Sequence, residues 1–93
     1  MSTYVEQVID ALAARLPDCE ADLIRLYALL ALSKGGATTL EDVHHAWSLW
    51  CATDRPGHRS IVPFEQLAAE VQELDRPYAE AIRAVATELR IAA

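Results

Sequence analysis

A nearly continuous run of apolar side chains dominates the segment 19–34. The seven residues Leu26 to Leu32 are all apolar, and Lys34 is the next charged residue after Arg25. A helix that is apolar on every side is stable only where other elements cover it. The Gly35-Gly36 pair that follows favours a left-handed helix stop. We therefore expect a central helix over residues 19–34, with the rest of the chain packed around it.

Three further segments carry apolar residues at the spacing of an amphipathic helix, namely residues 3–16, 40–52 and 77–91. A shorter helix is expected over residues 64–74. Together with the central helix, these segments predict an all-α fold, a small bundle of four to five helices in a single domain over residues 1–93. A chain of this length is in the usual size range of one domain rather than two.

One short stretch departs from the helical pattern. Residues 53–57 have the composition of a turn, and residues 58–64 form the only β-like stretch. Val62 is biased toward extended backbone because it precedes a proline. We therefore expect a short extended segment at about residues 58–64, which lays Ile61, Val62 and Phe64 across the helices.

Residues that favour helix starts precede each of the longer helices. The candidates are Ser2 or Thr3 (the latter with Glu6 as a capping box), Asp18, Thr38 with Glu41 or Thr39 with Asp42, and Asp75. Their side chains can accept hydrogen bonds from the free amides of a first helical turn. Much of the acidic charge is thereby assigned to helix caps.

The charge balance narrows the classes of partner. The net charge is −6 at pH 7, and the eight Lys and Arg residues are scattered. Nucleic acids and acidic membrane surfaces bind clustered basic residues, so both are disfavoured as partners. The longest apolar run, of seven residues, is far below the roughly 20 that a membrane span needs, and no signal peptide is expected. Cys19 and Cys51 lack any paired spacing, which is typical of a cytoplasmic protein.

Residues with catalytic or metal-binding chemistry are few. A zinc site would have to combine His44, Cys51 and His58, which lack the spacing of known ligand sets. Packing of His44 in the core, with a satisfied ring nitrogen, is the favoured alternative. Ser48, Ser60 and Cys51 have no strained turn of the kind that exposes a nucleophile. We expect no catalytic residue, no metal and no cofactor, and hence a protein that is not an enzyme.

Two tryptophans lie three residues apart on the helix predicted over 40–52. Trp47 is expected to anchor the core, and Trp50 to remain partly exposed. Stacking on an aromatic ring beside guanidinium groups would suit a planar anionic ligand. The candidate ligand-binding residues are Trp50, Arg55, His58, Arg59 and Arg76.

Several motifs of the second half of the chain form a pattern. They are Val43-His44-x-x-Trp47, His58-x-x-Ile61-Val62-Pro63-Phe64-x-x-Leu67 and Asp75-Arg76. Over about residues 41–85 this pattern is similar to that of the ryanodine-receptor (RyR) domain family, in a short version of actinobacterial or phage type without the family's GWxYG-like segment. The resemblance implies a helical, non-catalytic module and a structural role for the motif residues. It also implies sensing of a nucleotide-like ligand.

Two functions follow as expectations. The first is a small interaction module that binds another protein or self-associates through the helix over 19–34, because its apolar surface exceeds what a small monomer covers easily. The second is a binder or sponge of a nucleotide-like small-molecule signal, which would suit a phage counter-defence protein. In either case the expected location is the cytoplasm, or the host cytoplasm for a phage protein, with no nucleic acid or membrane as partner.

Overall fold

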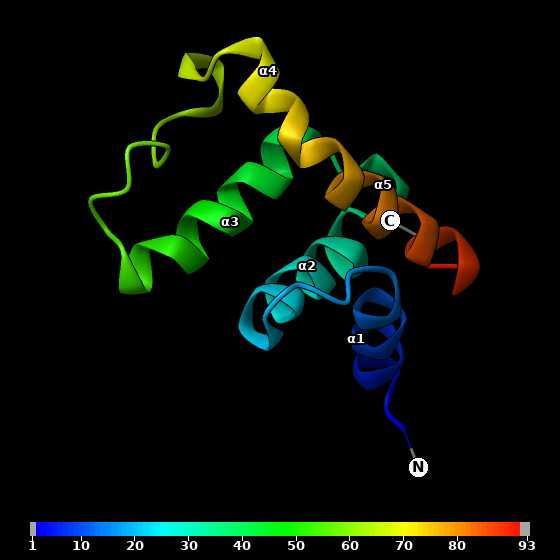
Figure 1. Cartoon of the computed structure of the whole chain (residues 1–93). Coiled ribbons are helices and arrows are strands. Elements are labelled where there is room, and N and C mark those ends of the chain that lie inside the picture. The colour runs from blue at the N-terminus through cyan, green and yellow to red at the C-terminus, as the bar shows by residue number, and fades with distance from the viewer. Residues whose placement is uncertain (1, 92–93) are drawn as a thin grey trace.

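The computed structural model describes residues 2–91, which form α-helices and short 3₁₀-helices and contain no strand (Figure 1). The α-helices are α1 (Tyr4–Arg15), α2 (Ala21–Ser33), α3 (Leu40–Asp54), α4 (Ala69–Gln72) and α5 (Arg76–Glu88). The 3₁₀-helices are η1 (Gly35–Ala37), η2 (Phe64–Gln66) and η3 (Glu73–Asp75). The predicted all-α bundle is therefore confirmed. None of the helices described is long and apolar enough to cross a membrane.

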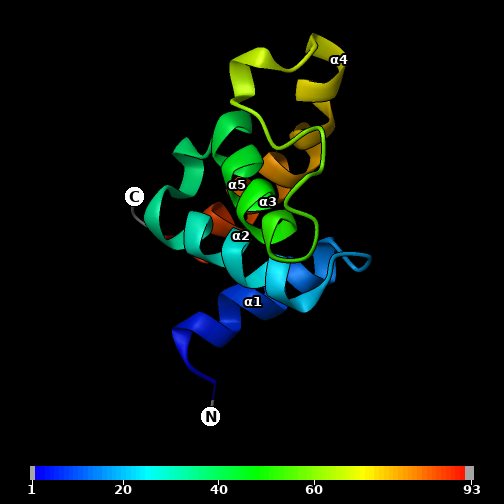
Figure 2. The same ribbon diagram turned by 90° about the vertical axis from the view of Figure 1, so that its left-hand side faces the viewer.

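Helix α2 lies at the centre of the bundle, in contact with α1, α3 and α5 (Figures 1 and 2). Its buried residues are Leu23, Ile24, Tyr27, Ala28 and Ala31. Leu29 is the large apolar side chain of α2 that stays exposed, at 61%. The prediction of a central helix is thus confirmed, and the chain's own helices cover most of its apolar surface.

The hydrophobic core forms where α1, α2, α3 and α5 meet. Leu12 of α1, Val43 of α3, and Ile82 and Val85 of α5 are each 0% exposed. Complete burial of a side chain of this size contributes roughly 1.5–3 kcal/mol to folding. These residues come from the apolar stripes that the helical spacing identifies, so the periodicity predicts the main core contacts correctly.

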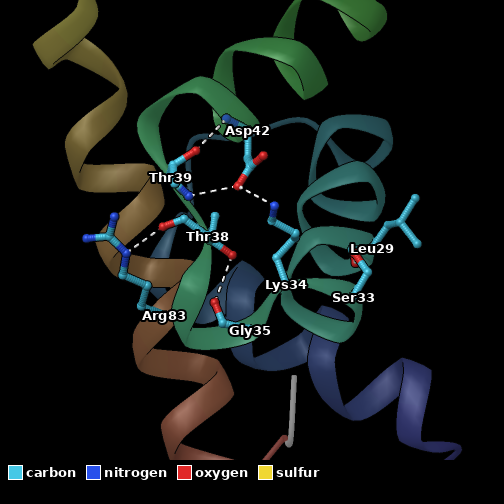
Figure 3. Close-up of polar contacts among 8 residues, drawn as sticks. All are labelled: Leu29, Ser33, Lys34, Gly35, Thr38, Thr39, Asp42 and Arg83. Atoms are coloured by element: carbon cyan, nitrogen blue, oxygen red, sulfur yellow. Dashed lines mark hydrogen bonds and ion pairs between the residues drawn. The ribbon is translucent and has the colours of Figure 1, made fainter.

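The connection between α2 and α3, which we call the α2–α3 junction (residues 34–42), buries a polar residue (Figure 3). Thr38 is 1% exposed, and its Oγ1 donates a hydrogen bond to the Gly35 carbonyl at 2.8 Å. The Thr38 carbonyl accepts from Arg83 Nε of α5 at 2.7 Å. Gly35 has a left-handed φ of 53°, which only glycine adopts without strain. The junction therefore ties α5 to the end of α2.

A capping box closes the other side of the junction and begins α3. The Asp42 amide donates to Thr39 Oγ1 at 3.1 Å, and the Thr39 amide donates to Asp42 Oδ2 at 2.9 Å (Figure 3). Lys34 Nζ lies 3.6 Å from the same carboxylate oxygen. Burial alone would raise the pKa of Asp42, but the hydrogen bonds from Thr39 and the nearby Lys34 lower it below its ordinary value. Of the two predicted caps, the structure selects Thr39 with Asp42.

The predicted cap at Asp18 is wrong, whereas Asp75 occupies the N-cap position of α5 without a side-chain cap. The Cys19 amide donates to the Leu16 carbonyl at 3.1 Å, which holds Asp18 in a turn ahead of the helix. Glu20 precedes α2 instead, without a side-chain cap. Asp75 makes no capping bond because its backbone is already helical, with φ −82° and ψ −11°. Its carboxylate is therefore not used at the start of α5.

Residues 58–63 of the segment predicted to be extended are non-helical, but they are built from turns rather than a strand, and Phe64 begins η2. The His58 amide donates to the Arg55 carbonyl at 3.0 Å, and the Ile61 amide donates to the His58 carbonyl at 3.0 Å. Extended backbone follows at Pro63, with φ −51° and ψ 140°. Local turn bonds thus replace the pairing that a strand would need.

The single helix predicted over 64–74 is wrong, because η2, α4 and η3 occupy this stretch in succession. Leu67 and Ala68 have extended backbone, with ψ angles of 144° and 149°. The Gln72 side-chain amide donates to the carbonyls of Phe64 at 3.0 Å and Leu67 at 3.2 Å. A side chain therefore satisfies carbonyl groups that a continuous helix would have paired internally.

Candidate ligand-binding site

A cavity of about 560 Å³ opens between α2, α3 and the start of α5. Segments that lie far apart in the sequence line it, from the turn after α1 to the first turn of α5. The lining residues are Asp18, Cys19, Glu20, Leu23, Tyr27, His44, Trp47, Trp50, His58, Ser60, Leu67, Val71, Leu74, Asp75 and Tyr78. The volume is in the range of small-molecule sites in proteins.

Aromatic side chains form much of the wall of this cavity. Both tryptophans of the chain, Trp47 and Trp50, line it from α3 and are partly buried. Tyr27 and Tyr78 line it from α2 and α5, with their ring centroids 5.8 Å apart. The His58 ring meets Trp47 edge-on at 5.2 Å. Trp47, expected as a core anchor, therefore sits at the boundary between the core and the cavity.

The Tyr27 hydroxyl is a polar group left unused by the fold. The side chain is 1% exposed, and the described residues give its hydroxyl no hydrogen-bond partner. No buried polar side-chain atom among these residues is both unpaired and sealed from solvent. The hydroxyl must therefore reach the open space of the cavity. Burial, with smaller contributions from Cys19, Asp75 and Tyr78, raises the pKa of Tyr27, which keeps the hydroxyl protonated.

Three carboxylates give the cavity its charge. Asp75 is partly buried, whereas Asp18 and Glu20 are exposed. Within residues 2–91, none of the three makes a side-chain hydrogen bond or an ion pair, and none of the lining residues is Lys or Arg. Burial raises the pKa of Asp75, and His44 partly opposes this effect. The electrostatic potential in the cavity is therefore negative.

The two histidines of the cavity are held by hydrogen bonds. His44 is 4% exposed, and its Nε2 lies 2.6 Å from the Val62 carbonyl. A carbonyl oxygen only accepts, so Nε2 carries the proton that it donates. His58 Nδ1 accepts from the Ser60 amide at 3.1 Å. Packing of His44 with a satisfied ring nitrogen is thus confirmed, and its ring also stacks on Trp47 at 5.9 Å.

The remaining candidates for chemistry lie apart from one another. Cys51 is 2% exposed and does not line the cavity. Cys19 does line it, and its pKa is raised, first by burial and then by Asp18. Among residues 2–91, no group of three or more His, Cys, Asp or Glu side chains is placed to hold a metal ion.

The structure brings together only two of the predicted ligand-binding residues. Trp50 and His58 line the cavity, whereas the three arginines do not. Arg55 and Arg59 are exposed in the connection after α3. Arg76 turns to Glu73, with 2.6 Å between Nε and Oε2. The guanidinium groups that were expected to hold an anion are thus absent from the lining.

Several cavity residues were missed by sequence reasoning. The apolar run around Tyr27 predicts only a packing role for it, although a buried tyrosine usually needs a partner for its hydroxyl. The sequence pattern predicts a cap at Asp75 and an apolar stripe that includes Tyr78. For Asp18 and Glu20 no signal existed, because helix starts are commonly acidic.

The motif residues have mainly packing roles. Val43 is fully buried, the His44 ring lies 6.0 Å from the Phe64 ring, and Leu67 lines the cavity. Ile61 and Val62 are partly buried, and Pro63 is exposed. Buried helix positions and a proline turn of this kind occur in many helical proteins, so the pattern they form has little specificity.

Comparison with known proteins corrects the family assignment. Neither the curated proteins nor the solved structures gave a match. The resemblance to the ryanodine-receptor domain is wrong, because the family model that matches covers residues 3–87 and describes a different domain. The assignment to a short actinobacterial or phage version of that domain is wrong with it. The chain belongs to the family described as "Domain of unknown function (DUF7701)".

Proposed function

We propose that the chain is a non-enzymatic binding module that holds a small molecule in the cavity between α2, α3 and α5. The observation that carries the proposal is the aromatic-walled cavity of about 560 Å³ that the unpaired Tyr27 hydroxyl reaches. Small-molecule sites are typically apolar hollows with a few well-placed polar groups. A hydroxyl that faces a cavity and has no protein partner is available to hydrogen bond to a ligand.

The state of the reactive groups supports binding rather than catalysis. The His44 Nε2 proton is committed to Val62, and His58 Nδ1 is committed to the Ser60 amide. Ser48 Oγ lies 3.4 Å from the first of these nitrogens. Because that nitrogen already carries the proton donated to Val62, it cannot take a second proton from the Ser48 hydroxyl, as a general base would have to do. The raised pKa of Cys19 keeps this thiol protonated, and the thiolate is the reactive form.

The two tryptophans provide the test of this proposal. Because both line the cavity, a ligand there must change the fluorescence of Trp47 or Trp50. We expect members of a small-fragment panel to alter the emission saturably in the wild type and in Tyr4→Ser, which changes an exposed residue at 70%. Trp50→Phe should retain the signal of Trp47 and bind more weakly. A panel that leaves the emission unchanged at millimolar concentration would contradict the proposal.

Self-association through α2 is a second candidate function, favoured by two exposed leucines. Leu29 of α2 and Leu49 of α3 are 61% and 65% exposed. Leu49 also lines a shallow groove of about 320 Å³ with Leu26 and Trp50. Light scattering tests this candidate. A dimer that Leu29→Asp dissociates and Tyr4→Asp leaves intact would support it, and a monomer at high micromolar concentration would contradict it.

A further inference from the structure

We infer that the cavity takes a small organic cation, such as a primary amine or a quaternary ammonium compound. This inference rests on the proposed binding function and names the class of its ligand. A cation differs from the nucleotide-like ligand expected from the sequence. The structure shows carboxylates in the cavity lining and leaves the three arginines outside it.

The negative charge of the cavity lining excludes an anionic ligand. Asp18, Glu20 and Asp75 all face the cavity, and the lining contains neither Lys nor Arg. A phosphate or carboxylate would enter this field without a compensating positive group, although anion sites normally supply one. The net charge of −6 adds to the attraction of cations from a distance.

The aromatic wall adds a second kind of attraction for cations. Trp47 and Trp50 line the cavity together with Tyr27 and Tyr78. The face of an aromatic ring is electronegative, and it attracts a cation that lies within about 6 Å of the ring. Aromatic rings combined with a carboxylate are the groups that distinguish an ammonium group from a neutral molecule of the same shape.

Asp75 shows why a cation in particular is required. Its carboxylate is partly buried and has no partner among residues 2–91, which is an unfavourable state for a charge. Asp75 and Tyr27 line the same cavity. A cation beside Asp75 would compensate the charge, while the Tyr27 hydroxyl would hydrogen bond to a polar group of the ligand.

Choline and its uncharged isostere 3,3-dimethylbutan-1-ol provide the test, because they share a shape and differ in charge. Adenosine monophosphate serves as an aromatic anion. Binding is measured by tryptophan fluorescence for the wild type, Asp75→Asn and Asp10→Asn. Asp10→Asn is the control, because it makes the same change of charge at an exposed residue of α1 that does not line the cavity. We expect the wild type to prefer choline to the isostere by about tenfold, the difference expected for one cation–π contact and one carboxylate.

The outcomes separate the inference from the proposed function. Asp75→Asn should reduce the preference for choline to near one, and Asp10→Asn should retain it. Equal binding of choline and its isostere, or tighter binding of adenosine monophosphate, would overturn the inference and leave the binding function in place. If Asp10→Asn lowered the preference as much as Asp75→Asn, net charge rather than the cavity would be responsible, and the inference would fail. If none of the three compounds bound to the wild type, the result would contradict both the inference and the proposed function.

Discussion

The α2–α3 junction, which leads into α3, and the cavity, which α3 helps to line, differ in how their polar groups are paired. In the junction, Thr38, Thr39 and Asp42 all have hydrogen-bond partners (Figure 3). In the cavity, Tyr27 and Asp75 have none among the described residues. A paired polar group stabilises a fold, whereas an unpaired one costs free energy. The junction therefore serves stability, and under the proposed function the unpaired groups of the cavity would be available to a ligand.

The two carboxylates Asp42 and Asp75 express this contrast directly. The pKa of Asp42 is lowered below the ordinary value because its hydrogen bonds and Lys34 outweigh the effect of burial. The pKa of Asp75 is raised because burial outweighs the effect of His44. Changes to the junction should therefore destabilise the protein, and changes to the polar groups of the cavity should impair binding while leaving stability largely intact.

The largest effect is expected for Arg83→Met, which removes the bond to the buried Thr38 carbonyl but keeps the apolar stem. A hydrogen bond to a charged group contributes about 1.5–3 kcal/mol, so unfolding in urea should become easier by that amount. Arg15→Met is the control, since it breaks an exposed pair with Glu88 at 3.1 Å. Such exposed pairs contribute less than about 1 kcal/mol. Equal losses in the two variants would contradict a special role for the junction.

Gly35→Ala should lower stability by about 1–2 kcal/mol, the cost of a left-handed backbone for a residue with a Cβ. The neighbouring Gly36→Ala is a matched control. A Cβ at Gly36 meets nothing within 4 Å, and its φ is not left-handed. Thermal denaturation followed by circular dichroism compares the two variants. A Gly36→Ala variant as unstable as Gly35→Ala would show that the left-handed turn is not what matters.

Thr39→Ala should cost about 1 kcal/mol, because it removes the N-cap of α3. Thr53→Ala, near the end of the same helix, removes only an exposed hydroxyl with a 3.5 Å contact. We expect the latter change to stay within about 0.5 kcal/mol of the wild type. Urea titrations of both variants make the comparison, and indistinguishable midpoints would argue against the capping box.

Asp75→Asn is expected to have the smallest effect on stability, and one of opposite sign. Because the folded pKa is raised, the stabilising contribution of the carboxyl is full below its ordinary pKa of 3.8 and is lost as the pH rises through the raised value. Asparagine avoids this loss, so the variant should gain stability relative to the wild type as the pH rises above 3.8.

Asp42→Asn should show the reverse pH dependence. The folded pKa of Asp42 is lowered, so its contribution is present above 3.8 and is lost as the pH falls through the lowered value. The variant should therefore be less stable than the wild type at pH 7, and the difference should disappear in acid. Parallel pH profiles for Asp42→Asn and Asp75→Asn would contradict the contrast between the two regions.

The junction and the cavity also differ in how far they follow from the sequence. The capping box joins Thr39 to Asp42, three residues apart, and the spacing alone predicts it. The central helix and the core residues Leu12 and Val43 follow equally from periodicity. Such features depend on neighbours in the chain or on repeated helical turns, which a sequence displays directly.

The cavity depends on contacts between residues up to 60 positions apart, from Asp18 to Tyr78. Nothing local distinguishes a tyrosine that faces a cavity from one that packs in the core. Arg55 and Arg59 follow Trp50 closely in the sequence, which favours a shared ligand. In the structure both are exposed and neither lines the cavity, and only the tertiary structure shows this.

The most direct test of the account is a ¹H–¹⁵N NMR titration of the wild-type protein with choline. The indole N–H signals of Trp47 and Trp50 and the amides around Asp75 should shift saturably, while the amides of Thr38 and Thr39 should stay in place. This pattern is the one expected if the cavity is open to a cation and the junction is closed. Unchanged indole signals at saturating choline, or equal shifts in both regions, would contradict the account.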